Sequence, residues 1–189
     1  MIDWTNRYEF LGSALLFEGA LIGIAGVLGG WLGYHPLAEF RWTLAGLGWG
    51  LAGTGPLLVL FALSYRFPIG GLKRIKQILL ETLGPSLAVC CWHDLLLLGA
   101  VAGVSEELLF RGVLQPAMGL AGSNLVFGLV HAVSLLYALL AAGIGCLLGW
   151  QFQESQNLLA PIVTHSLYDF VAFVVIARDA RRLFPGKPE

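Results

Sequence analysis

Runs of about 20 apolar residues dominate the sequence and restrict what the chain can fold into. A run of this length is what an α-helix needs to cross a bilayer. Hydrophobic residues make up 57% of the 189 residues and charged residues only 12%, whereas a soluble domain averages about 25% charged residues. The apolar runs occupy 11–32, 43–65, 86–119, 123–150 and 158–177. The sequence therefore predicts an all-α fold, a polytopic transmembrane helix bundle.

The segment at 66–84 differs from these runs in composition. It places four cations on an amphipathic pattern, namely Arg66, Lys73, Arg74 and Lys76. A helix with a cationic polar face and an apolar opposite face lies in the membrane interface. We therefore expect one amphipathic interfacial helix on an anionic leaflet instead of a further span.

Basic residues also set the expected topology. They favour the cytoplasmic side of a membrane, and they gather at 66–76 and in a tail at 178–187. Two basic regions on one side require an even number of crossings between them. We therefore expect the run at 123–150 to form two helices with a turn near 132–134, a re-entrant segment being the alternative.

The whole sequence is predicted to form a single domain over 1–189, because no repeat or linker divides it. It is expected to hold about six spanning or partly spanning helices. The run at 86–119 would extend about 50 Å as one helix, longer than one membrane thickness, so we expect a kink near 102–105. The net charge of −1 indicates no nucleic-acid partner. We expect a multi-pass protein of a prokaryotic plasma membrane, with a cytoplasmic C-terminus and a retained N-terminal anchor.

Charged groups inside the apolar runs need an explanation, since each costs about 3 kcal/mol or more to place in a bilayer. The segment 103–116, "GVSEELLFRGVLQP", holds three of them. Glu107 and Arg111 are four residues apart, share a helix face and can form an ion pair, so we assign both to structural support. Glu106 lies about 100° round the helix from Glu107 and needs a partner from another helix.

Two histidines and an aspartate supply that partner. His131 and His165 are each the one histidine of their apolar run, and Asp169 follows His165 by four residues, on the same helix face. Three helices can therefore direct Glu106, His131 and the His165/Asp169 pair to one point. There Glu106 and His131 would activate a water, while His165 and Asp169 would bind a scissile carbonyl and stabilise its oxyanion.

Three short motifs resemble those of a known family. "EELLFR" at 106–111 is similar to the E-E-x-x-x-R motif of the CPBP family, which comprises the CAAX proteases and bacteriocin-processing (Abi) proteins. "FGLVH" at 127–131 and "HSLYD" at 165–169 resemble its F-x-x-x-H and H-x-x-x-[N/D] motifs. The motifs occur in family order and define a core at about 100–170.

The resemblance implies an intramembrane endopeptidase, a CAAX-protease-like enzyme. Its implied catalytic residues are Glu106, His131, His165 and Asp169. Its substrate would be a membrane-associated protein or peptide, for example a prenylated or otherwise lipid-anchored one. The enzyme would bind this substrate within the membrane lipid. Prenyl-protein-processing members carry Asn in place of Asp169. Because an ionised Asp cannot donate to an oxyanion, Asp169 must be protonated or must fix the tautomer of His165.

A metal-dependent protease mechanism is an alternative to the glutamate-dependent one. Glu106, His131 and His165 would make a three-ligand zinc site with an open position. No H-E-x-x-H spacing is present, and the family is also described as glutamate-dependent. We therefore favour a mechanism that requires no cofactor, with Zn²⁺ as the alternative.

Two further hypotheses belong to other functional classes. One is a non-catalytic membrane scaffold or bacteriocin-immunity protein, and the other is a small transporter that relays protons. Of the remaining ionisable residues, Glu18 is expected to snorkel towards the membrane edge or to have access to water, and His93 and Asp94 are expected at the interface.

Overall fold

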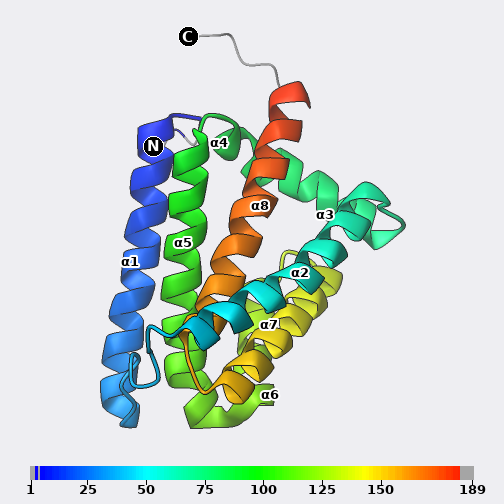
Figure 1. Cartoon of the computed structure of the whole chain (residues 1–189). Helices are drawn as coiled ribbons and strands as arrows, with labels where there is room; N and C mark the ends of the chain where they lie inside the picture. The colour runs from blue at the N-terminus through cyan, green and yellow to red at the C-terminus, as the bar shows by residue number, and fades with distance from the viewer. Residues whose placement is uncertain (1–2, 4, 184–189) are drawn as a thin grey trace.

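The computed structural model describes residue 3 and residues 5–183, and these form a helical bundle (Figure 1). The described residues contain no strand, so the all-α prediction is confirmed. The helices are α1 (Arg7–Leu32), α2 (Leu44–Arg66), α3 (Gly71–Ile78), α4 (Gly84–Ala88), α5 (Trp92–Leu109), α6 (Gln115–Val130), α7 (Leu135–Ser155) and α8 (Leu159–Leu183), with π-helical turns η1 (Leu79–Leu83) and η2 (Phe110–Leu114).

Five helical stretches are long and apolar enough to cross a membrane. They are α1, α2, α7, α8 and the stretch Trp92–Val130, which joins α5, η2 and α6. The prediction of a polytopic membrane bundle is confirmed. The count differs from about six because α6, 16 residues long, continues from α5 and is too short for a full span.

The predicted turn near 132–134 is present. It lies between the end of α6 at Val130 and the start of α7 at Leu135. Ser134 caps α7 by accepting a hydrogen bond from the Tyr137 amide at 3.2 Å. Figure 1 shows that α6 and α7 run back along each other from this turn.

The kink predicted near 102–105 is wrong. Helix α5 continues unbroken to Leu109, and the chain departs from α-helix only at η2 and at Gly119. Gly119 has φ +76°, a conformation that glycine adopts without steric cost. The small residue Gly103 serves packing instead, because a Cβ there would lie 2.8 Å from the Ser166 backbone nitrogen on α8.

The cationic stretches lie at one end of the bundle. Figure 1 shows α3, α4 and the C-terminal part of α8 at the same end. In α3, Ile75 is buried while Lys73 and Arg74 are exposed, as an amphipathic interfacial helix requires. Lys187, which belongs to the predicted basic tail, lies outside the described residues.

The same end of the bundle is tied by a polar contact between α1 and α5. Arg7 donates to both carboxylate oxygens of Asp94, at 2.6 and 2.8 Å. Asp94 is buried and also accepts from the Cys91 amide at the start of α5, whereas the side chain of His93 is 58% exposed. Asp94 therefore fixes α1 to the N-terminus of α5 and is not directed into the site.

Candidate active site

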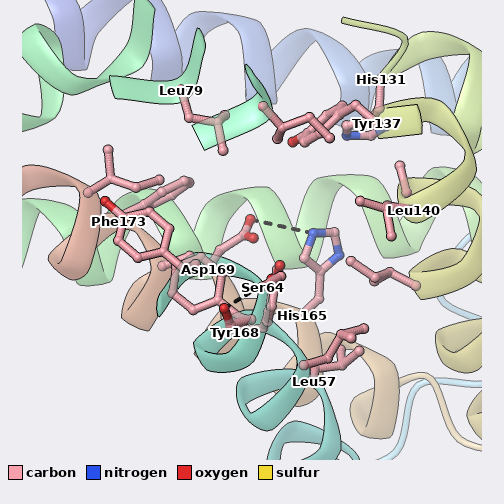
Figure 2. Close-up of a pocket in the computed structure, with 18 of the residues that line it drawn as sticks. Leu57, Ser64, Leu79, His131, Tyr137, Leu140, His165, Tyr168, Asp169 and Phe173 are labelled. Carbon is pink, nitrogen blue, oxygen red and sulfur yellow. Dashed lines mark hydrogen bonds and ion pairs between the residues drawn. The ribbon is translucent and has the colours of Figure 1, made fainter. Parts of the chain in front are cut away.

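A cavity of about 380 Å³ opens among α2, α3, α5, α7 and α8 (Figure 2). Most of its wall is aliphatic or aromatic, including Leu57, Phe61, Leu140 and Phe173. All four residues predicted to be catalytic line the cavity, and so does a further carboxylate, that of Glu18. This polar set consists of Glu18, Glu106, His131, His165 and Asp169.

Glu106 lies between the two histidines. Its Oε2 is 3.6 Å from Nε2 of His131 and 3.9 Å from Nε2 of His165. This oxygen is buried and has no hydrogen-bond partner among the described residues. The carboxylate thus faces both imidazoles at distances longer than a direct hydrogen bond.

His131 is held by the end of α6. It is the C-terminal capping residue of that helix, and its Nδ1 lies 2.8 Å from the carbonyl oxygen of Phe127, one turn earlier. The two rings stack with centroids 4.4 Å apart. Because a carbonyl only accepts, Nδ1 carries the proton and Nε2 is left to face Glu106.

His165 and Asp169 project from one face of α8, as their spacing predicted. Nε2 of His165 is 3.5 Å from Oδ2 of Asp169, and Figure 2 shows this pair directed into the cavity. His165 is buried and Asp169 is 19% exposed. From α8 the pair lines the cavity, and Nε2 of His165 faces Glu106.

The predicted ion pair between Glu107 and Arg111 forms, and both side chains are fully buried. Arg111 Nη1 donates to Glu107 Oε1 at 2.8 Å. Nη2 donates to the Gly145 carbonyl at 2.8 Å and lies 3.4 Å from Oδ1 of Asn124. The guanidinium therefore links α5 to α6 and α7 behind the cavity.

Glu107 has a second partner that the sequence interpretation missed. Its Oε1 lies 2.7 Å from Nδ1 of His165, so the glutamate orients the histidine as well as pairing with arginine. The available signal was the four-residue spacing of Gly99, Gly103 and Glu107, which share one face of α5. The glycines let α8 approach closely, and the glutamate one turn further on meets His165.

The expectation that Glu18 snorkels to the membrane edge is wrong. Its side chain points into the bundle, lines the cavity and is hydrogen-bonded to the Ser105 hydroxyl. The cause is the packing of α1 against α5, which places Glu18 beside the residue that precedes Glu106. A polar side chain on the facing helix makes an inward orientation less costly than hydrocarbon.

Glu106, His131 and His165 also suit a metal. A metal-binding histidine commonly holds its other ring nitrogen against a carbonyl or carboxylate. His131 does so with Phe127 and His165 with Glu107. The three residues could hold Zn²⁺, which when bound would polarise a carbonyl or activate water.

Comparison with known proteins finds a family model that matches part of the chain. Residues 88–171 match the family model for type II CAAX prenyl endopeptidase Rce1-like proteins. The match contains all three motifs and every cavity-lining carboxylate and histidine except Glu18. Over these residues the chain is similar to the CPBP family, which includes the CAAX proteases. The resemblance drawn from the motifs is confirmed.

One curated relative is the uncharacterized protein YpbD of Bacillus subtilis (strain 168). It is 37% identical over 70 residues, which make up 35% of this chain and 37% of the relative. The matching region thus spans little more than a third of that relative. No solved structure matches the chain.

Proposed function

We propose that this protein is an intramembrane endopeptidase that hydrolyses a peptide bond of a membrane-associated protein or peptide. The observation that carries the proposal is the position of Glu106 Oε2, which is buried, without a hydrogen-bond partner and within 4 Å of Nε2 of two histidines. A carboxylate so placed beside an apolar cavity has no structural task and is poised to bind water.

In the proposed mechanism, Glu106 and His131 hold the attacking water between them. Glu106 takes a proton as the water oxygen attacks the scissile carbonyl. His131 keeps its Nδ1 proton on the Phe127 carbonyl, so its Nε2 can accept from the same water. Each group supplies one of the two acceptors that orient a water for attack.

His165 would stabilise the oxyanion. Nδ1 of this histidine contacts Glu107 and its Nε2 faces Asp169 and Glu106. Both nitrogens can donate to these carboxylates only when the ring is doubly protonated. A doubly protonated imidazole donates to a developing oxyanion and has no lone pair for a metal, which favours the mechanism without a cofactor.

Asp169 would hold His165 in place. Because Glu107 already fixes Nδ1, Asp169 acts on the other nitrogen, at 3.5 Å, and positions the Nε2 proton towards the cavity. The Arg111 guanidinium in turn fixes Glu107. The proposed chain of support runs from Arg111 through Glu107 to His165.

The cavity also bears on the substrate. Its walls are largely apolar and include residues of the amphipathic helix α3. This favours a substrate delivered in membrane lipid, such as a prenylated or otherwise lipid-anchored peptide. We further propose that the cationic end of the bundle faces the cytoplasm of a prokaryotic cell, and we expect no nucleic-acid partner.

The test is cleavage of a fluorogenic panel of lipidated and unlipidated peptides by purified protein in detergent, with and without a strong chelator. We expect turnover that survives the chelator. Turnover lost to the chelator and restored by zinc would assign Glu106, His131 and His165 as metal ligands. Tight binding of peptides without any cleavage would support the non-catalytic scaffold.

A further inference from the structure

We propose that Glu18, outside all three motifs, is a further catalytic residue: it is held protonated in the cavity wall and donates its proton to the departing amine. The inference rests on the proposed peptidase function and adds to it the residue that completes the proton transfers. It comes from the hydrogen bonds and charge partners of the five acidic and histidine side chains that line the cavity.

The first argument is the distribution of partners for the cavity carboxyls. Glu106 lies within 4 Å of two histidines, and Asp169 lies within 4 Å of one. Glu18 has a serine hydroxyl as its partner. An isolated carboxylate in apolar surroundings is so costly that it takes up a proton instead. Lys76, the cation of the cavity wall, is bonded to the Tyr65 carbonyl at 3.1 Å and stacked on the Tyr65 ring.

The second argument is the hydrogen-bond count at Ser105. Its Oγ is hydrogen-bonded to Glu18 Oε2 and also lies 3.2 Å from the Ala102 carbonyl oxygen. A hydroxyl has one proton to donate, and a carbonyl oxygen can only accept. When the carboxyl of Glu18 brings a proton of its own, both bonds form in full; otherwise the one hydroxyl proton is shared between two acceptors.

The third argument is position. Ser105 directly precedes Glu106 on α5, and Glu18 lines the same cavity as Glu106 from the side of α1. When the carbonyl carbon of a substrate lies at the water held by Glu106, the substrate therefore also lies beside the neutral carboxylic acid of Glu18 on the adjacent wall. Among the described carboxyls of the cavity, Glu18 is the one that forms no ion pair with a histidine within 4 Å.

The proton transfers then balance. Glu106 takes a proton from water as the carbon–oxygen bond forms. The carbon–nitrogen bond breaks, its electron pair goes to nitrogen, and nitrogen takes the proton of Glu18. The products are a carboxylic acid and an amine, while Glu106 is protonated and Glu18 ionised. Return of one proton from Glu106 to Glu18 through the shared cavity restores both.

The test compares a peptide with a matched activated ester in Glu18→Gln, since a phenolate leaves without protonation whereas an amine does not. We expect kcat for the peptide to fall by about 100-fold or more and kcat for the ester by less than about 10-fold. Glu9→Gln, on the exposed part of the same helix, should leave both unchanged. Equal losses on peptide and ester in Glu18→Gln would overturn the assignment.

An infrared measurement tests the protonation state without any substrate. We expect a carbonyl stretch of a protonated carboxyl in the wild-type spectrum that disappears in Glu18→Gln and persists in Glu9→Gln. Absence of this band would overturn the inference even where peptides are cleaved. A band assigned to Glu18 in a protein that cleaves nothing would instead refute the proposed peptidase function while leaving the proton on Glu18 established.

Discussion

Removal of Arg111 should destabilise the bundle through the charge it leaves behind. Glu107 and Arg111 are both fully buried, and Arg111→Met keeps the volume while it removes the guanidinium from the Glu107 carboxylate, which retains His165 as its partner. Breaking a buried ion pair in this way costs about 3–5 kcal/mol. The loss of the donor to the Gly145 carbonyl contributes about 1 kcal/mol of that amount.

The double variant Glu107→Gln/Arg111→Met separates these contributions. It removes both charges, and the Gln oxygen can still accept from Nδ1 of His165. We expect it to recover about 2–4 kcal/mol of the loss, leaving mainly the unpaired carbonyl. Arg178→Met, which alters an exposed pair with Asp179 at 3.7 Å, is the control and should change stability by about 0–1 kcal/mol.

The assay is equilibrium unfolding by SDS in mixed micelles, followed by circular dichroism. The expected order of stability is wild type and Arg178→Met first, then the double variant, then Arg111→Met. If Arg111→Met unfolds like the wild type yet has no peptidase activity, the pair is not structural support and the argument from buried charge fails.

Two other predictions follow from the site and its packing. Asp169→Asn should retain at least wild-type turnover, because the amide can still contact His165 and also donates to an oxyanion; a loss of kcat above about 100-fold would show that the carboxyl itself is needed. Gly103→Ala should lower stability by about 1–3 kcal/mol, since its Cβ would lie 2.8 Å from the Ser166 nitrogen and 3.1 Å from the Ile162 carbonyl oxygen. Gly26→Ala, with no atom within 4 Å of the new Cβ, is its control, and equal losses in SDS unfolding would contradict the packing argument.

The sequence predicted what depends on periodicity and local spacing. Apolar length identifies the spans, and the four-residue spacings of Glu107 with Arg111 and of His165 with Asp169 give shared helix faces. The parity of crossings between basic stretches predicted the turn before α7. These features follow from one helix at a time or from the membrane itself.

What the sequence did not predict depends on contacts between helices. The bond from His165 to Glu107 requires the close approach of α5 and α8, and the inward direction of Glu18 requires α1 to pack beside Ser105. The chain bends at Gly119 and in η2 instead of at 102–105, because Gly103 is used to admit α8. A single sequence carries no direct signal for which faces meet.

The most direct test of the account is kcat for Glu106→Gln beside Glu107→Gln, each confirmed as folded by SDS unfolding. The two glutamates are adjacent in sequence, but one faces the cavity and the other holds Arg111 and His165. The account predicts that Glu106→Gln retains wild-type stability and loses turnover by about 100-fold or more, while Glu107→Gln mainly loses stability. Wild-type turnover in folded Glu106→Gln would contradict the central claim that this carboxylate activates the water.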